Sequence, residues 1–348
     1  MRRTFSAVAV ATLSLGVLTA CDPPMPEALL VAQAESEVQC GDAGNAAMYL
    51  DGGFVDLGYS WKEMLVGACP DLSLEIVEDK SSAQIIATAT APECSPYATG
   101  PIGYDGAAIV FYLDEAFSIN LNGLAIQGIF SGAIKSWSDP RIQDINPEVE
   151  LPNSEIFVMQ SSAQPAIEAM EDWTAYLTGA EVGFGLLQDD PDAYFFDLSM
   201  ELGSGGIALI PMSDALAAGA TIANVVLDDG TTILPESQSI YAGSTMFSFE
   251  TEETTVTSKF DFSLEPKPFP GTTEVSSPYA AMYPVKLYLC DEDNLTVRAI
   301  ARYFVRLDAQ GIISTTTLQG LGEDVRIASA VVLGKGLPLP ESVMPEDN

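Results

Sequence analysis

Histidine is absent from the 348 residues of this chain. Catalytic triads, cysteine–histidine pairs, histidine-ligated zinc and histidine pH switches all need an imidazole, so none of them can form. Carboxylate pairs could still act as acid and base, but no pair is marked out by its spacing. We therefore expect no enzyme, no catalytic residue, no metal site and no cofactor.

Positive charge is scarce, with 14 Lys and Arg against 49 Asp and Glu. Nucleic-acid binding usually rests on a basic face, so this composition argues against it. The negative charge also opposes long-range attraction of an anionic solute, although salt screens that field beyond roughly 8 to 10 Å.

Long apolar runs are missing except near the start of the chain. Arg2 and Arg3 precede an apolar segment, Phe5 to Leu18, that is too short for a typical spanning helix. The residues that follow, Leu-Thr-Ala-Cys ending at Cys21, resemble the lipobox of bacterial lipoproteins, whose cysteine carries the lipid. We predict a lipoprotein signal peptide over residues 1–21.

Two alternatives to this leader stay open. One is a plain signal peptide with a chance cysteine, and the other is twin-arginine export, which the Arg-Arg-x-Phe start permits. Residues 22–39, rich in proline and carboxylates, are predicted to be a tether between the membrane and the folded part.

Four cysteines remain after Cys21, and export into an oxidising compartment favours two disulfides. Cys40 precedes the first predicted strand and Cys69 the second. Parallel strands would bring these two to the same sheet end. Of the three possible connectivities we therefore prefer Cys40 with Cys69, which leaves Cys94 with Cys290.

The stretch from Ala107 to Trp137 organises the chain. A continuous apolar run, 107–113, predicts a strand buried on both faces. Asn122 is placed to cap a helix and Gly132 to end it. The apolar positions of this helix recur at helical spacing, at Leu124, Ala125, Ile129 and Phe130.

Apolar periodicity predicts further elements along the chain. A hairpin is predicted through 228–230, and 235–283 is interpreted as β-rich or irregular surface. The expected strands are 46–50, 72–77, 84–88, 156–159 and 283–289, and the expected helices are 55–66, 213–220 and 296–310, with another after Pro165.

The order of residues after the buried strand resembles the phosphate-binding proteins of ABC-type phosphate transporters. That family carries a Leu-Asn/Thr, Ile-Phe-x-Gly-x-Ile, Trp-x-Asp-Pro pattern at fixed spacing. The matching positions here are Leu121, Asn122, Ile126 to Phe130, Gly132, Ile134, Trp137, Asp139 and Pro140. The similarity covers roughly residues 44 to 340 and is carried by scaffold positions.

The resemblance implies an α/β fold of the two-lobed, type II periplasmic-binding class, with two hinge crossings near residues 105 and 285. It implies one lobe from residues 40–106 plus 284–348 and another from 107–283. Ligands of such folds bind in the cleft between the lobes, at strand ends and helix N-termini.

The family also implies where the ligand contacts should lie in the first lobe. Its Gly-Ser/Thr-Phe-Val loop aligns with Gly53 and Phe54, which keep the backbone and lose the hydroxyl. A phosphate-binding aspartate aligns with Thr90. Glycines at a strand-to-helix turn can equally be required by the turn alone.

In the second lobe the family's oxyanion cradle, Arg-Ser-Asp-Gly-Ser-Gly-Thr, aligns with the turn that begins at Ser161. Ser162 matches the first serine, Ser161 stands at the arginine, and Ala163 at the aspartate. Each charge-assisted hydrogen bond is worth roughly 1.5 to 3 kcal/mol, so these losses should weaken phosphate binding by orders of magnitude unless other groups substitute. The serines could also serve as an ordinary helix cap.

The resemblance therefore predicts a monomeric, extracytoplasmic solute-binding lipoprotein, anchored through lipid on Cys21 to the outer face of a bacterial cytoplasmic membrane. It would deliver a small oxyanion, phosphate first, to an ABC permease. The alternative is a scaffold that has lost phosphate binding and serves as an interaction or sensory lipoprotein, or binds another small ligand.

Overall fold

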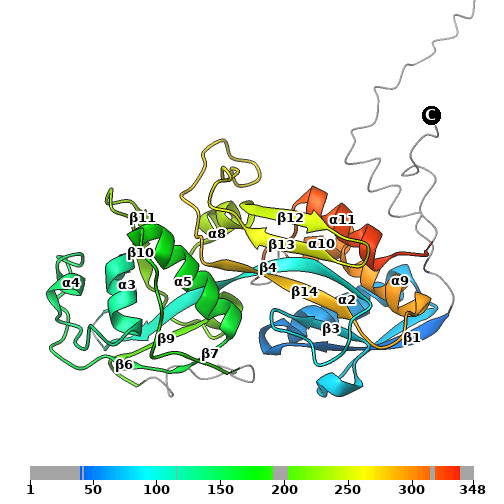
Figure 1. Ribbon diagram of the computed structural model, residues 1–348, viewed down its shortest axis with the longest axis horizontal. Helices are drawn as coiled ribbons and strands as arrows, with labels where there is room; N and C mark the ends of the chain where they lie inside the picture. The colour runs from blue at the N-terminus through cyan, green and yellow to red at the C-terminus, as the bar shows by residue number, and fades with distance from the viewer. Residues whose placement is uncertain (1–39, 41–42, 115, 191–202, 314–317, 338–348) are drawn as a thin grey trace, which may run out of the picture. The chain divides into compact units, whose positions relative to one another are not determined.

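The structure is a computed structural model that describes residues 40, 43–114, 116–190, 203–313 and 318–337. The predicted signal peptide, the lipidation residue Cys21 and the predicted tether over 22–39 lie outside these residues. The described chain is mixed α/β, as predicted, and is built on a seven-stranded sheet (Figure 1).

The central sheet has the strand order β2-β1-β3-β14-β4-β9-β6. Its first three strands are parallel, β14 runs antiparallel to both β3 and β4, β4 is antiparallel to β9, and β6 is parallel to β9. The strands are β1 (Gly44–Leu50), β2 (Leu72–Ile76), β3 (Ile85–Thr88), β4 (Ala98–Tyr112), β6 (Phe157–Val158), β9 (Gly206–Pro211) and β14 (Met282–Leu289).

Strand β4 is longer than the predicted strand over 107–113. It begins at Ala98 and runs for 15 residues, of which only Tyr112 is exposed. Its first half pairs with β14 and its second half, from Ala107, pairs with β9. The first half of β4 was not predicted because its glycines interrupt the apolar pattern. These glycines permit close packing, since a Cβ on Gly103 would lie 2.9 Å from the carbonyl oxygen of Gln319.

Buried side chains form two large clusters along this sheet. One contains residues between Ala46 and Ile102 together with residues from Val285 to Leu337. The other contains residues between Tyr104 and Tyr283. The described part of the chain thus has a separate apolar core at each end of the β4–β14 pair.

Helices and short 3-10 turns surround the strands. The helices are α2 (Val55–Ala68), α3 (Gly123–Phe130), α4 (Pro140–Gln143), α5 (Gln164–Thr178), α7 (Met212–Ala217), α8 (Ser237–Ser244), α9 (Leu295–Phe304), α10 (Leu307–Ile313) and α11 (Glu323–Leu333), with 3-10 turns η1 (Gly52–Phe54) and η2 (Lys80–Ser82). The small sheets pair β5 (Asn120–Leu121), β10 (Asn224–Val226) and β11 (Thr232–Ile233), β7 (Ser161–Ser162) with β8 (Gln188–Asp189), and β12 (Phe247–Thr251) with β13 (Val256–Phe260).

The helix after the buried strand forms as predicted. The side chain of Asn122 accepts a hydrogen bond from the Ala125 amide at 2.9 Å, and Gly132 adopts a left-handed φ of +78° just beyond the helix end. The prediction was wrong at Leu124, which is 63% exposed, whereas Ile126 is fully buried. The apolar face is therefore shifted by part of a turn.

Three other predictions need correction. The region 235–283 holds the strands β12 and β13, in line with the β-rich expectation, but it also contains α8, whose serine-rich sequence carries a capping box between Glu236 and Ser239. The helix over 296–310 is two helices, α9 and α10, because the chain turns at Val305, whose carbonyl accepts a hydrogen bond from Arg326. The pattern also missed α11.

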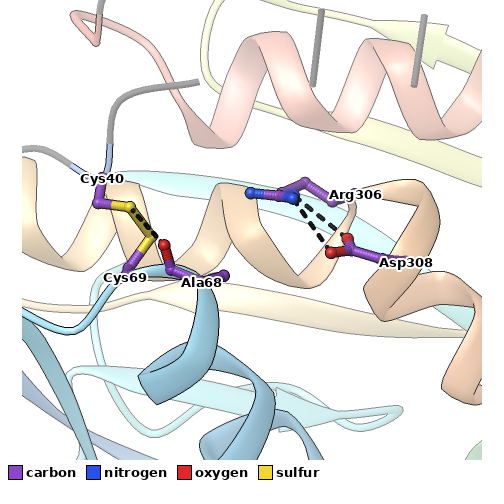
Figure 2. Close-up of a disulfide and its surroundings, with 5 residues drawn as sticks. All are labelled: Cys40, Ala68, Cys69, Arg306 and Asp308. Carbon is purple, nitrogen blue, oxygen red and sulfur yellow. Dashed lines mark hydrogen bonds and ion pairs between the residues drawn. A yellow bond between two sulfur atoms is a disulfide. The ribbon is translucent and has the colours of Figure 1, made fainter. Parts of the chain in front are cut away.

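Both disulfides form with the preferred connectivity, Cys40 with Cys69 and Cys94 with Cys290. Figure 2 shows the first of these, which joins Cys40, four residues before the start of β1, to Cys69 at the C-terminal end of α2. Strands β1 and β2 are parallel, as the prediction required. In the same view Arg306 makes a two-pronged contact with Asp308, through its Nε at 3.2 Å and its Nη2 at 3.1 Å.

Candidate functional site

The first strand-to-helix turn follows β1 directly. Asp51 ends the strand, with its amide bound to the Ala87 carbonyl, and its own carbonyl accepts from the Phe54 amide at 2.8 Å. The ring of Phe54 is buried in the first apolar cluster, so this predicted site residue packs the turn against the core. Gly53 is half-buried and has no side chain, so only its backbone could contact a ligand.

Thr90 lies beside this turn and is joined to it through Thr88. The two threonine hydroxyls lie 2.8 Å apart, and the Thr90 amide donates to the Thr88 hydroxyl at 3.0 Å. The Thr88 hydroxyl donates in turn to the carboxylate of Asp51, whose other oxygen lies 4.0 Å from the Lys80 ammonium. The ends of β1 and β3 therefore share one polar network.

The second strand-to-helix turn makes contacts of a different kind. Ser162 is fully buried and donates its hydroxyl to the Leu209 carbonyl at 2.7 Å. Ser161 donates to the carboxylate of Asp190 at 2.6 Å, and the amide of Gln164 donates to Asp189 at 3.1 Å. Both predicted serines therefore already have protein partners.

The predicted residues are only partly brought together. Thr90 and Phe54 are bonded to the network at the ends of β1 and β3, through Thr88 and through the Asp51 carbonyl, and Gly53 immediately precedes Phe54 in the same turn. Among the described residues, no hydrogen bond or ion pair links Ser161 or Ser162 to that network.

Sequence reasoning missed two carboxylates that face the first turn. Asp105, in the middle of β4, accepts from the Gly106 amide at 2.7 Å and from the Ser213 amide and hydroxyl at 3.1 and 2.6 Å. Asp214 follows in the first turn of α7. A Cβ on Gly53 would lie only 2.5 Å from Asp214 Oδ1, so α7 abuts the glycine turn.

Asp214 is the exceptional member of this group. It is 7% exposed, yet its carboxylate receives no hydrogen bond from any residue that the structure describes. Burial, followed by the negative charges of Asp105 and Asp51, raises its pKa from 3.8 to about 7. A largely buried carboxylate that no donor compensates is costly to ionise, so Asp214 is suited to a proton or to a ligand that brings a donor.

The two neighbouring carboxyls are better compensated. Burial raises the pKa of Asp105 to about 6, against the hydrogen bonds from Ser213 and Gly106 that lower it. Burial also raises the pKa of Asp51, against the Thr88 hydrogen bond and the Lys80 charge. No periodic pattern marks these carboxylates in the sequence. The position of Asp51 directly after a predicted strand is the feature that could have identified it.

A cavity of about 330 Å³ lies elsewhere, between α8, β12 and the start of α11. Aromatic side chains, Tyr104, Tyr241, Phe247 and Phe249, form much of its lining. None of the residues of the two strand-to-helix turns lines it.

The described residues contain neither a candidate membrane span nor a candidate metal cluster. No helix there combines the length and the hydropathy that crossing a bilayer requires. No group of three or more acidic, cysteine or histidine side chains there is arranged to hold a metal ion.

The fold is shared with solved structures. A candidate phosphate ABC transporter substrate-binding protein from Clostridium perfringens, with bound phosphate, superimposes with a TM-score of 0.51 at 14% identity over 80% of this chain and 100% of that chain. A high affinity periplasmic phosphate-binding protein bound with phosphate gives 0.50 at 11% identity, over 82% and 92%. The chain therefore has the type II periplasmic-binding fold.

The chain is also similar in sequence to curated phosphate-binding proteins. Phosphate-binding protein PstS 3 of Mycobacterium tuberculosis (strain ATCC 25618 / H37Rv) is 26% identical over 209 residues, which are 53% of this chain and 55% of that protein. PstS 2 of the same strain is 33% identical over 88 residues, 25% of this chain and 22% of that protein. No family model matches. The chain spans about half the length of the curated relatives it matches first, and it is a divergent relative of phosphate-binding proteins, as its sequence indicated.

Proposed function

We propose that this chain is an extracytoplasmic solute-binding protein that captures a small oxyanion, most favourably phosphate, for an ABC transporter. The observation that carries the proposal is the network of Thr90, Thr88 and Asp51 beside the glycine turn before α2. It offers a hydroxyl and backbone amides to phosphate oxygens and a carboxylate to a P–OH group, at a helix N-terminus. The relatives named above support phosphate as the solute.

We propose specific roles for the site residues. Gly53 would offer its backbone N–H, and Phe54 would hold the turn against the core. The Thr90 hydroxyl would exchange its hydrogen bond to Thr88 for one to a phosphate oxygen. Ser161 would contribute from the facing turn by exchanging its bond to Asp190 for one to the ligand. Ser162, which is buried and bonded to the Leu209 carbonyl, would support that turn from within the core.

We also propose the predicted lobe boundaries, 40–106 plus 284–348 for one lobe and 107–283 for the other. The division of the buried side chains into two clusters near residues 103 and 284 supports them. Closure of the lobes would bury the ligand between the two strand-to-helix turns.

The remaining parts of the proposal concern anchoring and partners. Lipid on Cys21 would attach a monomer to the outer face of the membrane, where it meets the transmembrane subunits of the permease. Absence of histidine and of a marked nucleophile–base pair supports binding rather than catalysis, and the acidic composition supports no role with nucleic acid.

A second candidate function is favoured by the carboxylates. Asp51, Asp105 and Asp214 gather at the proposed cleft, with Asp214 buried and without a donor. A scaffold that has lost phosphate binding would then capture a solute rich in hydrogen-bond donors, or act as an interaction or sensory lipoprotein.

Calorimetric titration separates the two functions. The full chain, purified in detergent and free of phosphate, would be titrated with phosphate, sulfate, and neutral and cationic solutes. Binding of phosphate supports the first function; its absence at millimolar phosphate, in a protein shown to be folded, refutes it. Binding of a neutral or cationic solute instead would favour the second.

A matched pair of variants tests the site itself. Thr90→Val removes the hydroxyl and should weaken phosphate binding roughly ten- to hundredfold, the value of one hydrogen bond to a charged group. Thr257→Val, on an exposed strand position of β13, should leave affinity unchanged. Equal affinities for the two variants would contradict the proposed site.

A further inference from the structure

A short strand, β8, lies against the turn that precedes α5. It pairs in parallel with β7, and the Gln188 amide donates to the Gln160 carbonyl at 2.7 Å. The Asp190 amide donates to the Ser162 carbonyl at 2.9 Å. These backbone bonds hold Asp189 and Asp190 beside the first residues of the helix.

Both carboxylates are bonded to the turn. Asp189 Oδ1 accepts from the amide of Gln164, the first residue of α5, at 3.1 Å. Asp190 Oδ2 accepts from the hydroxyl of Ser161 at 2.6 Å. Two negative groups of the chain thus lie where a helix N-terminus and a hydroxyl would otherwise attract an external anion.

The other donors of this turn are also used or missing. Pro165 has no N–H. The amides of Ala166 and Ile167 both donate to the Ala163 carbonyl, at 3.0 and 3.1 Å, and the Ser162 hydroxyl is bound to Leu209. Within the described residues, the amides of Gln164, Ala166 and Ile167 and the hydroxyls of both serines therefore all have protein acceptors.

We infer that Asp189 and Asp190 act as an internal substitute for an anion at the α5 turn and thereby set which solutes the cleft accepts. This inference rests on the proposed function, because it concerns the same cleft. An oxyanion must compete with two carboxylates for the Gln164 amide and the Ser161 hydroxyl, and it also meets their negative charge at short range. The two carboxylates therefore weaken the binding of any oxyanion at the α5 turn, so a captured phosphate would be held mainly by the Thr90 side of the site.

The test removes both carboxylates. Asp189→Ala/Asp190→Ala frees the two donors, and Asp172→Ala/Glu181→Ala removes the same charge from exposed positions on and after α5. The full chain in detergent would be titrated calorimetrically with inorganic phosphate and with sulfate at low ionic strength. We expect the first variant to bind phosphate at least tenfold more tightly than the wild type, and the control to stay within about threefold, because only the first variant exposes donors.

The outcomes separate this inference from the proposed function. Phosphate binding by the wild type tests the function, whereas the ratio between the two double variants tests the inference. A ratio near one overturns the inference whether or not the wild type binds. Binding by the first variant alone supports the inference and refutes phosphate capture by the wild type.

A second double variant serves as a control for unfolding of the alanine pair. Asp189→Asn/Asp190→Asn removes the charge and keeps side-chain oxygens that can still accept the two hydrogen bonds. It should give a smaller gain in phosphate affinity than the alanine pair, and the Gln164 amide resonance should respond to phosphate in the alanine pair and not in the wild type. A gain in neither pair, with native circular dichroism retained, overturns the inference.

Discussion

Replacing Asp214 by asparagine should remove a large part of the pH dependence of stability. In the folded chain this carboxyl is buried and receives no hydrogen bond from the described residues. The negative charges of Asp105 and Asp51 also oppose its ionisation. Its pKa is therefore about 7 in the folded state, against 3.8 for an unperturbed aspartate. The folded state binds the proton more tightly, so stability is greatest at low pH and falls as pH rises toward and through 7.

The magnitude follows from the two pKa values. Between pH 5 and pH 8, a group with a pKa near 4 unfolded and about 7 folded loses about 2.5 kcal/mol of stabilising free energy. Asparagine has no proton to lose, so this contribution disappears. Its amide can also donate toward Asp105, which should make the variant more stable than the wild type at pH 8.

The assay is urea unfolding, followed by circular dichroism with the disulfides intact, at pH 5, 6.5 and 8. The overall negative charge gives every variant a common pH dependence, and Asp172→Asn measures that background with a charge removed from an exposed site. We expect the pH 5 to pH 8 loss to be about 2 kcal/mol smaller in Asp214→Asn than in this control. Equal losses in the two variants would refute the account of Asp214.

Two further changes test the packing around the site and the covalent frame. Gly53→Ala places a Cβ 2.5 Å from Asp214 Oδ1 and should lower the free energy of unfolding by roughly 1 to 3 kcal/mol. Gly67→Ala, with nothing within 4 Å of the added Cβ, should raise it by up to about 1 kcal/mol. Urea unfolding measures both changes, and effects of the same sign would contradict the packing argument. Cys94→Ala/Cys290→Ala removes a disulfide that spans 196 residues and should lower the free energy of unfolding by roughly 5 kcal/mol. This loss should exceed the loss from removing the Cys40–Cys69 disulfide, which spans 29 residues. The reverse order in calorimetric unfolding would refute the loop-entropy argument.

The scaffold could be predicted because burial leaves a strong mark on sequence. The apolar run in β4, the cap at Asn122 and the parallel start of the sheet each rest on a local rule that the fold obeys. The same rules failed where burial was achieved by small or polar residues. The first half of β4 is rich in glycine and α8 in serine, so neither shows the apolar period that identifies a buried element.

The candidate site was predictable only in part, because its contacts join distant segments. Gly53 and Thr90 lie in loops that directly follow β1 and β3, and strand ends are expected to meet. Asp214 faces Gly53 across 161 positions of sequence, and Asp189 caps a helix that begins 25 residues before it. Such contacts depend on the pairing of β4 with β14 and of β7 with β8, and no local sequence pattern encodes either pairing.

The arrangement of charge also bears on which oxyanion could enter. Sulfate carries no proton near neutral pH, so it would add two negative charges beside Asp51, Asp105 and Asp214 and supply no donor. Phosphate keeps at least one proton in the same range and can donate it to a carboxylate while its other oxygens accept from Thr90 and the glycine turn. Under the proposed function, a phosphate P–OH group would donate to the ionised form of Asp214, a hydrogen bond that sulfate cannot make. Discrimination against sulfate should therefore increase as pH rises through 7, where Asp214 loses its own proton.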